Sequence, residues 1–134
     1  MAGQRWMAAA VFLGALAACD ESVTGPSVGL DNTFTLAPGE AVSIADTSLT
    51  VQFHGVEGDS RCPADAFCIQ GGDAIVRVVV SRDGNRRDYE LHTGSMGPVR
   101  HDGFTIALVE LSPYPFSSRT IAPGEYRASL RVTR

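Results

Sequence analysis

Two cysteines, Cys62 and Cys68, lie close together in a segment that also carries Asp59, Arg61 and Asp65. Five residues separate the two thiols, whereas zinc-binding pairs are usually separated by about two to four residues and need two further ligands. Thiol redox catalysts use a Cys-x-x-Cys motif within a βαβ unit, and the sequence has neither feature. The spacing therefore favours a disulfide over a zinc site or a redox pair.

The disulfide is predicted to brace a loop that runs from residue 57 to residue 73 between two strands. Loops longer than about 12–15 residues in compact domains are usually functional or disordered. A second irregular segment, residues 112–118, alternates proline with aromatic residues and is expected to form a stiff extended loop. These two loops supply the residues predicted to contact a partner: Arg61, Asp65, Phe67, Tyr114 and Phe116.

Other side chains give weaker signals for chemistry. Asp59, Asp65 and Asp73 could supply oxygen ligands to calcium, although a simple ion pair between Asp59 and Arg61 is the structural alternative. Ser95, His101 and Asp102 contain the residue types of a catalytic triad, but they fall in one connecting segment and lack the Gly-x-Ser-x-Gly elbow. We therefore predict no catalytic residue, no metal ligand and no cofactor.

The position of Arg61 directly before Cys62 raises a different hypothesis. A disulfide-braced loop that exposes an arginine resembles the reactive loop of a trypsin-type protease inhibitor, and the loop at residues 57–73 would then be the inhibitory segment. A small enzyme or metal carrier that depends on His101 or Asp65 is a third hypothesis, from another functional class.

The N-terminus has the features of a bacterial lipoprotein signal. Arg5 precedes an apolar run from Trp6 to Ala18, which is too short for a membrane span of about 20 residues but typical of a secretory signal peptide. The run ends in Leu-Ala-Ala before Cys19, which resembles a lipobox, so Cys19 is predicted to carry diacylglycerol and further acyl chains. With Cys19 acylated, Cys62 and Cys68 remain as an even pair in an oxidising compartment.

Charge excludes some partners. Without Arg5, the chain keeps ten basic residues against fifteen acidic ones, a net charge of −5. Nucleic-acid binding requires a basic surface, so we expect none. The predicted partners are a membrane, through the N-terminal lipid, and a protein or glycan of the bacterial cell envelope, where the protein is expected to lie.

The remaining chain alternates with a period of two, which is typical of strands. Residues 19–32 are polar and aperiodic, which predicts a flexible tether, and residues 33–134 are predicted to form one domain.

A two-residue hairpin is expected at Asp83-Gly84, and Ala-Pro-Gly-Glu recurs at residues 37–40 and 122–125, where type II turns are expected. Strands are expected at residues 33–37, 41–45, 49–54, 74–81, 86–92, 104–111 and 126–132. About seven short strands predict an all-β, antiparallel, Ig-like β-sandwich, with a small β-barrel as the alternative.

One stretch resembles a known family. The chain resembles a family of short exported bacterial proteins and lipoproteins in four features. These are residues 59–63 (Asp-Ser-Arg-Cys-Pro), the second cysteine at position 68, Gly72 and the valine-rich strand after it. The likeness extends to residues 111–115 and 126–130. The family implies the fold and the disulfide but no activity, so the sequence predicts a lipid-anchored, non-enzymatic binding or structural module of the envelope.

Overall fold

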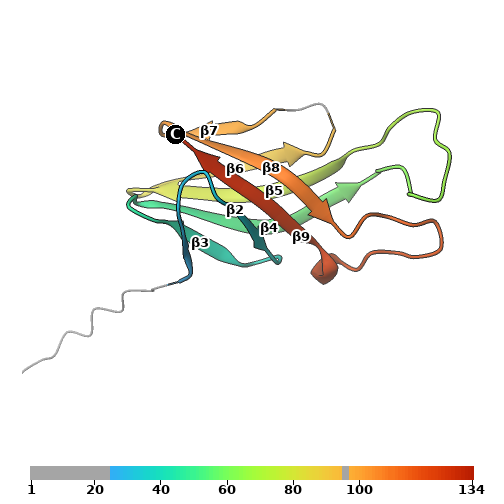
Figure 1. The fold of residues 1–134 in the computed structure, drawn as a ribbon, viewed down its shortest axis with the longest axis horizontal. Helices are drawn as coiled ribbons and strands as arrows, with labels where there is room; N and C mark the ends of the chain where they lie inside the picture. The colour runs from blue at the N-terminus through green and yellow to red at the C-terminus, as the bar shows by residue number, and fades with distance from the viewer. Residues whose placement is uncertain (1–24, 95–96) are drawn as a thin grey trace, which may run out of the picture.

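The computed structural model describes residues 25–94 and 97–134. The predicted signal peptide at residues 1–18, the lipidation residue Cys19 and Ser95 lie outside this part of the chain. Within it, the chain forms strands and one short 3-10 helix (Figure 1). The elements are β1 (Ser27–Val28), β2 (Thr33–Leu36), β3 (Ala41–Ile44), β4 (Leu49–Asp59), β5 (Ala74–Arg82), β6 (Asn85–His92), β7 (Val99–His101), β8 (Phe104–Ser112), η1 (Pro123–Glu125) and β9 (Arg127–Thr133).

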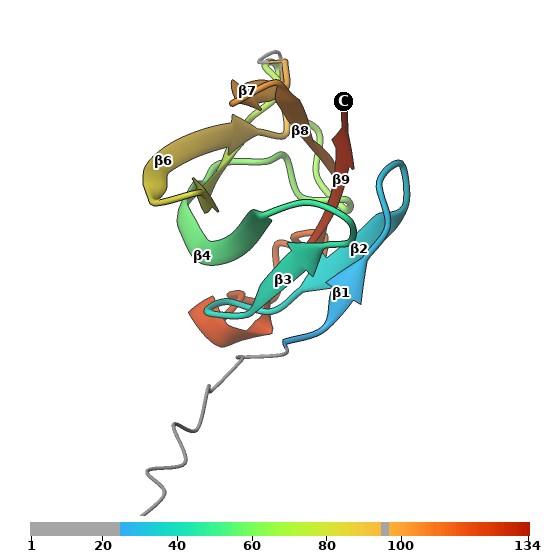
Figure 2. The same cartoon turned by 90° about the vertical axis from the view of Figure 1, so that its left-hand side faces the viewer.

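The strands form two sheets that pack face to face, as Figure 2 shows from the side. One sheet has the order β1-β3-β4-β5-β6 and the other the order β2-β9-β8-β7. All neighbours pair antiparallel except β1 and β3, which pair parallel. This is the predicted β-sandwich and not a closed barrel.

The core follows the alternation that the sequence displays. In β4, Leu49, Val51 and Phe53 are fully buried, and in β9 Leu130 and Val132 meet them from the opposite sheet. Because successive strand residues point to opposite faces, alternate apolar residues are enough to build one continuous core between the sheets. All seven predicted strands are present.

The structure differs from the sequence prediction in the extent of β4, in part of the predicted tether and in two additional short strands. β4 continues to Asp59 through two register shifts, so the loop that follows it spans residues 60–73 and not 57–73. Ser27–Val28 pairs with β3, and the Asp31 N–H donates to the Val132 carbonyl at 2.9 Å, so residues 27–31 of the predicted tether pack against the domain. β1 and β7 are too short to produce a detectable alternation.

Candidate functional site

The loop between β4 and β5, residues 60–73, is closed covalently and by hydrogen bonds at its base. Cys62 and Cys68 form the predicted disulfide, with their Cα atoms 6.0 Å apart. The Ser60 N–H donates to the Asp73 carbonyl at 2.7 Å, and the Asp73 N–H donates to the Ser60 hydroxyl at 3.1 Å. We call residues 60–73 the disulfide loop. Its two ends are held side by side, so the intervening residues project from one end of the sandwich (Figure 1).

A nearly buried ion pair fixes the start of this loop. The Arg61 guanidinium donates to both carboxylate oxygens of Asp59, at 2.9 and 2.7 Å. The two side chains are 7% and 11% exposed. A bidentate pair of this kind fixes direction as well as distance, because the planar guanidinium and carboxylate match each other.

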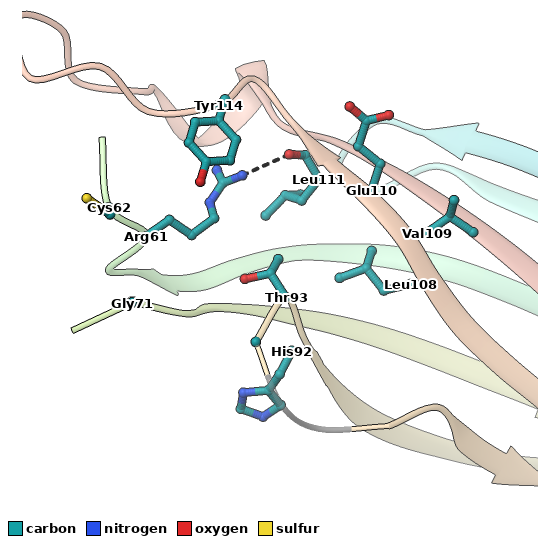
Figure 3. Close-up of a pocket in the computed structure, with 12 residues that line it drawn as sticks. Arg61, Cys62, Gly71, His92, Thr93, Leu108, Val109, Glu110, Leu111 and Tyr114 are labelled. Carbon is teal, nitrogen blue, oxygen red and sulfur yellow. Dashed lines mark hydrogen bonds between the residues drawn. The ribbon is translucent and has the colours of Figure 1, made fainter. Parts of the chain in front are cut away.

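The same guanidinium joins the disulfide loop to the opposite sheet. Arg61 Nη1 donates to the Leu111 carbonyl on β8 at 2.8 Å, and Nη2 donates to the Pro113 carbonyl at 3.0 Å. Its central carbon lies 5.3 Å from the centre of the Tyr114 ring, within cation–π range. Figure 3 shows Arg61 between Tyr114 and the β8 carbonyl of Leu111. Arg61 therefore joins the two sheets at the loop end.

Asp59 completes this cluster. The Tyr126 hydroxyl donates to its carboxylate at 3.0 Å from the chain segment just before β9. The hydrogen bonds from Arg61 hold the pKa of Asp59 below its ordinary value, against the opposing effect of burial. Burial, followed by the hydrogen bond to Asp59, raises the pKa of Tyr126 to about 12. At neutral pH the cluster thus contains a carboxylate, a guanidinium and a neutral phenol.

A second loop lies against the disulfide loop. We call residues 113–119 the aromatic loop. The Ala64 N–H donates to the Pro115 carbonyl at 2.9 Å, and the Ser117 N–H donates to Asp65 Oδ1 at 2.8 Å. The Ser117 hydroxyl donates to the other oxygen of Asp65. Asp65 therefore connects the two loops.

Large apolar side chains are exposed on these loops. Phe67 and Ile69 on the disulfide loop are about as accessible as in an extended chain, at 109% and 105%. Tyr114 and Phe116 on the aromatic loop are each about half exposed. Val109 on β8 is also half exposed, and these five are the exposed large hydrophobic residues of the described chain. We call Phe67, Ile69, Tyr114 and Phe116 the apolar tip.

A groove of about 530 Å³ opens beside Arg61 (Figure 3). One wall is the second half of β8, from Leu108 to Leu111. The other is formed by Gly71 and Gly72 of the disulfide loop and by residues 92–94, which follow β6. In this second wall, Asp73 accepts hydrogen bonds from the Gly94 N–H at 2.9 Å and from the Thr93 hydroxyl at 3.2 Å. Asp73 Oδ2 lies 2.5 Å from His92 Nδ1.

The structure changes the roles of several predicted residues. Phe67, Tyr114 and Phe116 are exposed, as a partner contact requires. Arg61 is buried and hydrogen-bonded within the protein, which gives it a role in the fold, whereas Asp65 is exposed and accepts hydrogen bonds from Ser117, so the prediction that these two residues contact a partner stays a prediction. Arg61 and Asp65 each bond to groups that lie up to 52 positions away in the sequence, so these contacts form only when the two loops meet in the fold.

The remaining candidates do not form a common site. Asp59, Asp65 and Asp73 have separate partners, and no group of three or more metal-ligating side chains occurs among residues 25–94 and 97–134. His101 is buried, with Nδ1 3.0 Å from the Tyr89 hydroxyl. Sequence reasoning did not identify Ile69 and Val109 as exposed residues, and it did not identify the groove. The groove exists only where segments that are distant in the sequence meet.

No helix in the described segments is long and apolar enough to cross a membrane. Comparison of the chain with family models, with curated proteins and with solved structures finds no match. The site is therefore interpreted from its own geometry.

Gly72 is predicted to be essential for closing the disulfide loop. A Cβ at this position would lie 1.4 Å from the Ser60 carbonyl oxygen, whereas a Cβ at Gly71 would meet nothing within 4 Å. We expect Gly72→Ala to lower the free energy of unfolding by about 1–3 kcal/mol, as overpacking does. Gly71→Ala, the matched control, should stay within about 0.5 kcal/mol of the wild type. Urea denaturation measures both, and equal stabilities of the two variants would contradict the close approach.

The Asp59 ion pair is predicted to make stability depend on pH. Because the folded-state pKa of Asp59 is lowered, its contribution is present above the unfolded pKa of about 4 and is lost as pH falls through the folded pKa. Asp59→Asn should therefore cost about 3 kcal/mol at pH 7, and its difference from the wild type should shrink in acid.

The matched control is Asp83→Asn, because Asp83 is exposed in the β5–β6 hairpin with a left-handed φ of 47°, which asparagine tolerates. Its effect should stay within about 0.5 kcal/mol. The measurement is urea denaturation between pH 3 and pH 7. A difference between Asp59→Asn and the wild type that is constant over this range would refute the role given to the pair.

Proposed function

We propose that this chain is a lipid-anchored, non-enzymatic binding module of the bacterial cell envelope, and that its apolar tip contacts a partner protein. The sandwich is the rigid platform, and the disulfide loop and the aromatic loop form the contact surface. The lipobox-like sequence before Cys19 supports the anchor and the location.

The observation that carries this proposal is the exposure of Phe67 and Ile69. Both side chains are fully accessible, although burial of a phenylalanine or isoleucine stabilises a protein by about 1.5–3 kcal/mol. Clusters of exposed large apolar residues on a soluble domain mark interaction sites. An aliphatic residue beside aromatic ones favours a protein partner, since glycan sites rely on aromatic stacking and hydrogen bonds.

The loops are held in place before any partner arrives. The disulfide, the Asp59–Arg61 pair and the hydrogen bonds from Ser117 to Asp65 restrict the backbone that carries Phe67 and Phe116. Binding loses less conformational entropy when the contact loops are already ordered. A surface of this kind supports binding without further chemistry.

The protease-inhibitor hypothesis receives no support from the position of Arg61. An inhibitory arginine must extend into the specificity pocket of the protease, whereas Arg61 is 9% exposed and hydrogen-bonded to Asp59, Leu111 and Pro113. Extension of the Arg61 side chain into solvent would break the ion pair with Asp59 that holds the disulfide loop.

Site-specific photo-crosslinking in living cells tests the proposal. A benzophenone amino acid replaces Phe67 in the full-length protein, and the matched control carries it at Arg87, an exposed position on β6. We expect a discrete protein adduct from position 67 and none from position 87, and Ile69→Ser should reduce its yield at least threefold. If position 67 gives no adduct, or both positions give the same pattern, the apolar tip is not the contact surface.

A further inference from the structure

Half of β8 has no strand on its outer side in the described chain. β7 pairs with β8 only from Phe104 to Ile106, where Val99 faces Ile106. β7 begins at Val99, so the ladder with β8 ends at this pair. β8 itself continues to Ser112. Among the described residues, 107–110 therefore have no pairing strand on this side, and we call them the β8 edge.

The backbone of Leu108 faces this edge. His101 and Phe104 flank a two-residue turn, so they form a hydrogen-bonded pair, and in an antiparallel ladder such pairs recur at every second residue. The N–H and C=O groups of Phe104, Ile106 and Leu108 therefore point to the β7 side. The donor and acceptor of Leu108 therefore point away from β9. Because β7 ends opposite Ile106, no β7 residue pairs with Leu108, which lines the groove.

The groove follows this same edge. Leu108, Val109 and Glu110 line it on one side, and Gly71 and Thr93 line it on the other (Figure 3). Its volume of about 530 Å³ is within the range of about 300–1,000 Å³ typical of ligand sites. Beyond it, Arg61 binds the Leu111 carbonyl, so the free edge is limited to a few residues. A short extended chain suits a groove that follows a strand edge whose backbone has no pairing strand in the described chain.

The charges around the groove indicate what such a chain carries. Glu110 is exposed on one side, and on the other side His92 lines the groove with its Nδ1 2.5 Å from Asp73 Oδ2, so that Asp73 already has a partner. The arginine of the groove, Arg61, is neutralised by Asp59. Opposite charges across paired strands stabilise the pairing. Glu110, which forms no ion pair with the described residues, therefore favours an extended occupant with a basic side chain, and Val109 and Tyr114 suit apolar side chains beside it.

A second copy of this chain is a poorer occupant. Residues 107–110 carry Glu110 and no basic side chain, so two paired β8 edges would hold two negative charges with no opposite charge on either strand. The register shift between Leu108 and Glu110 also bends the strand, which disfavours pairing with another edge of the same shape.

We propose that the β8 edge binds a short, extended, basic and apolar segment of the partner protein as an added strand, hydrogen-bonded to the N–H and C=O of Leu108. This inference rests on the proposed binding function and specifies how the partner is held. The partner's extended segment lies in the groove while its folded part contacts the apolar tip. Strand addition of this kind draws affinity from the backbone and specificity from alternate side chains.

Peptide selection on the full-length protein tests the inference. A displayed library of random octapeptides is selected on the detergent-solubilised wild type and counter-selected on Gly71→Tyr, whose added ring would lie in the groove. Gly124→Tyr is the matched control, since a Cβ at either glycine meets nothing within 4 Å and Gly124 does not line the groove. We expect selected sequences in which Arg or Lys alternates with β-branched residues.

The best selected peptide is then synthesised with and without N-methyl groups on alternate residues. We expect binding to slow the exchange of the Leu108 amide proton and to weaken at least tenfold with the methylated peptide and with Gly71→Tyr, but not with Gly124→Tyr. No enriched sequence, equal binding of the methylated peptide, or a dimer held by this edge would overturn the inference.

Phe67→Ser separates the two proposals. The isolated peptide should bind this variant within twofold of the wild type, because Phe67 does not line the groove. If the peptide fails to bind while the adduct from position 67 persists, only the strand addition is wrong. If the adduct is absent while the peptide binds at Leu108, the apolar tip is wrong and the edge stands.

Discussion

The bidentate pair between Asp59 and Arg61 is the interaction on which the geometry of the disulfide loop and the aromatic loop depends. Asp59 ends β4 in one sheet, and Arg61 reaches the backbone of the other sheet at Leu111. Removing both charges from water is costly, so such a pair adds little net stability, yet loss of one partner costs about 3–5 kcal/mol. Its main effect is therefore geometric: it fixes where the disulfide loop leaves the sandwich.

The contact surface and the groove both follow from this constraint. Arg61 holds the start of the disulfide loop against β8, which leaves Gly71 and Gly72 as the wall that faces Leu108. The disulfide and Asp65 then hold the far part of the loop beside the aromatic loop, and Phe67 and Ile69 remain in solvent. Under the two proposals, the apolar tip and the β8 edge would provide two modes of recognition at one end of the β-sandwich.

The sequence predicted what depends on local pattern. Alternation located the buried residues of β4 and β9, and cysteine spacing located the disulfide. It could not decide how identical segments fold: the first Ala-Pro-Gly-Glu turns with Gly39 at a φ of 88°, while the second forms η1 without a positive φ at its glycine. It indicated the ion pair between Asp59 and Arg61, which the structure contains, only as an alternative to a calcium site, because the other acceptors of Arg61 at Leu111 and Pro113 lie 50 and 52 residues away and become visible only when the sheets are packed.

Hydrogen exchange measured by mass spectrometry on the wild type and on Arg61→Met tests the central claim most directly, because methionine keeps much of the arginine stem without its charge. The claim predicts that residues 60–73 and 113–119 exchange at least tenfold faster in Arg61→Met, while the core strands β5 and β9 keep their protection. Unchanged protection of the two loops in Arg61→Met would contradict it, because the loop end would then be ordered without the Asp59–Arg61 pair.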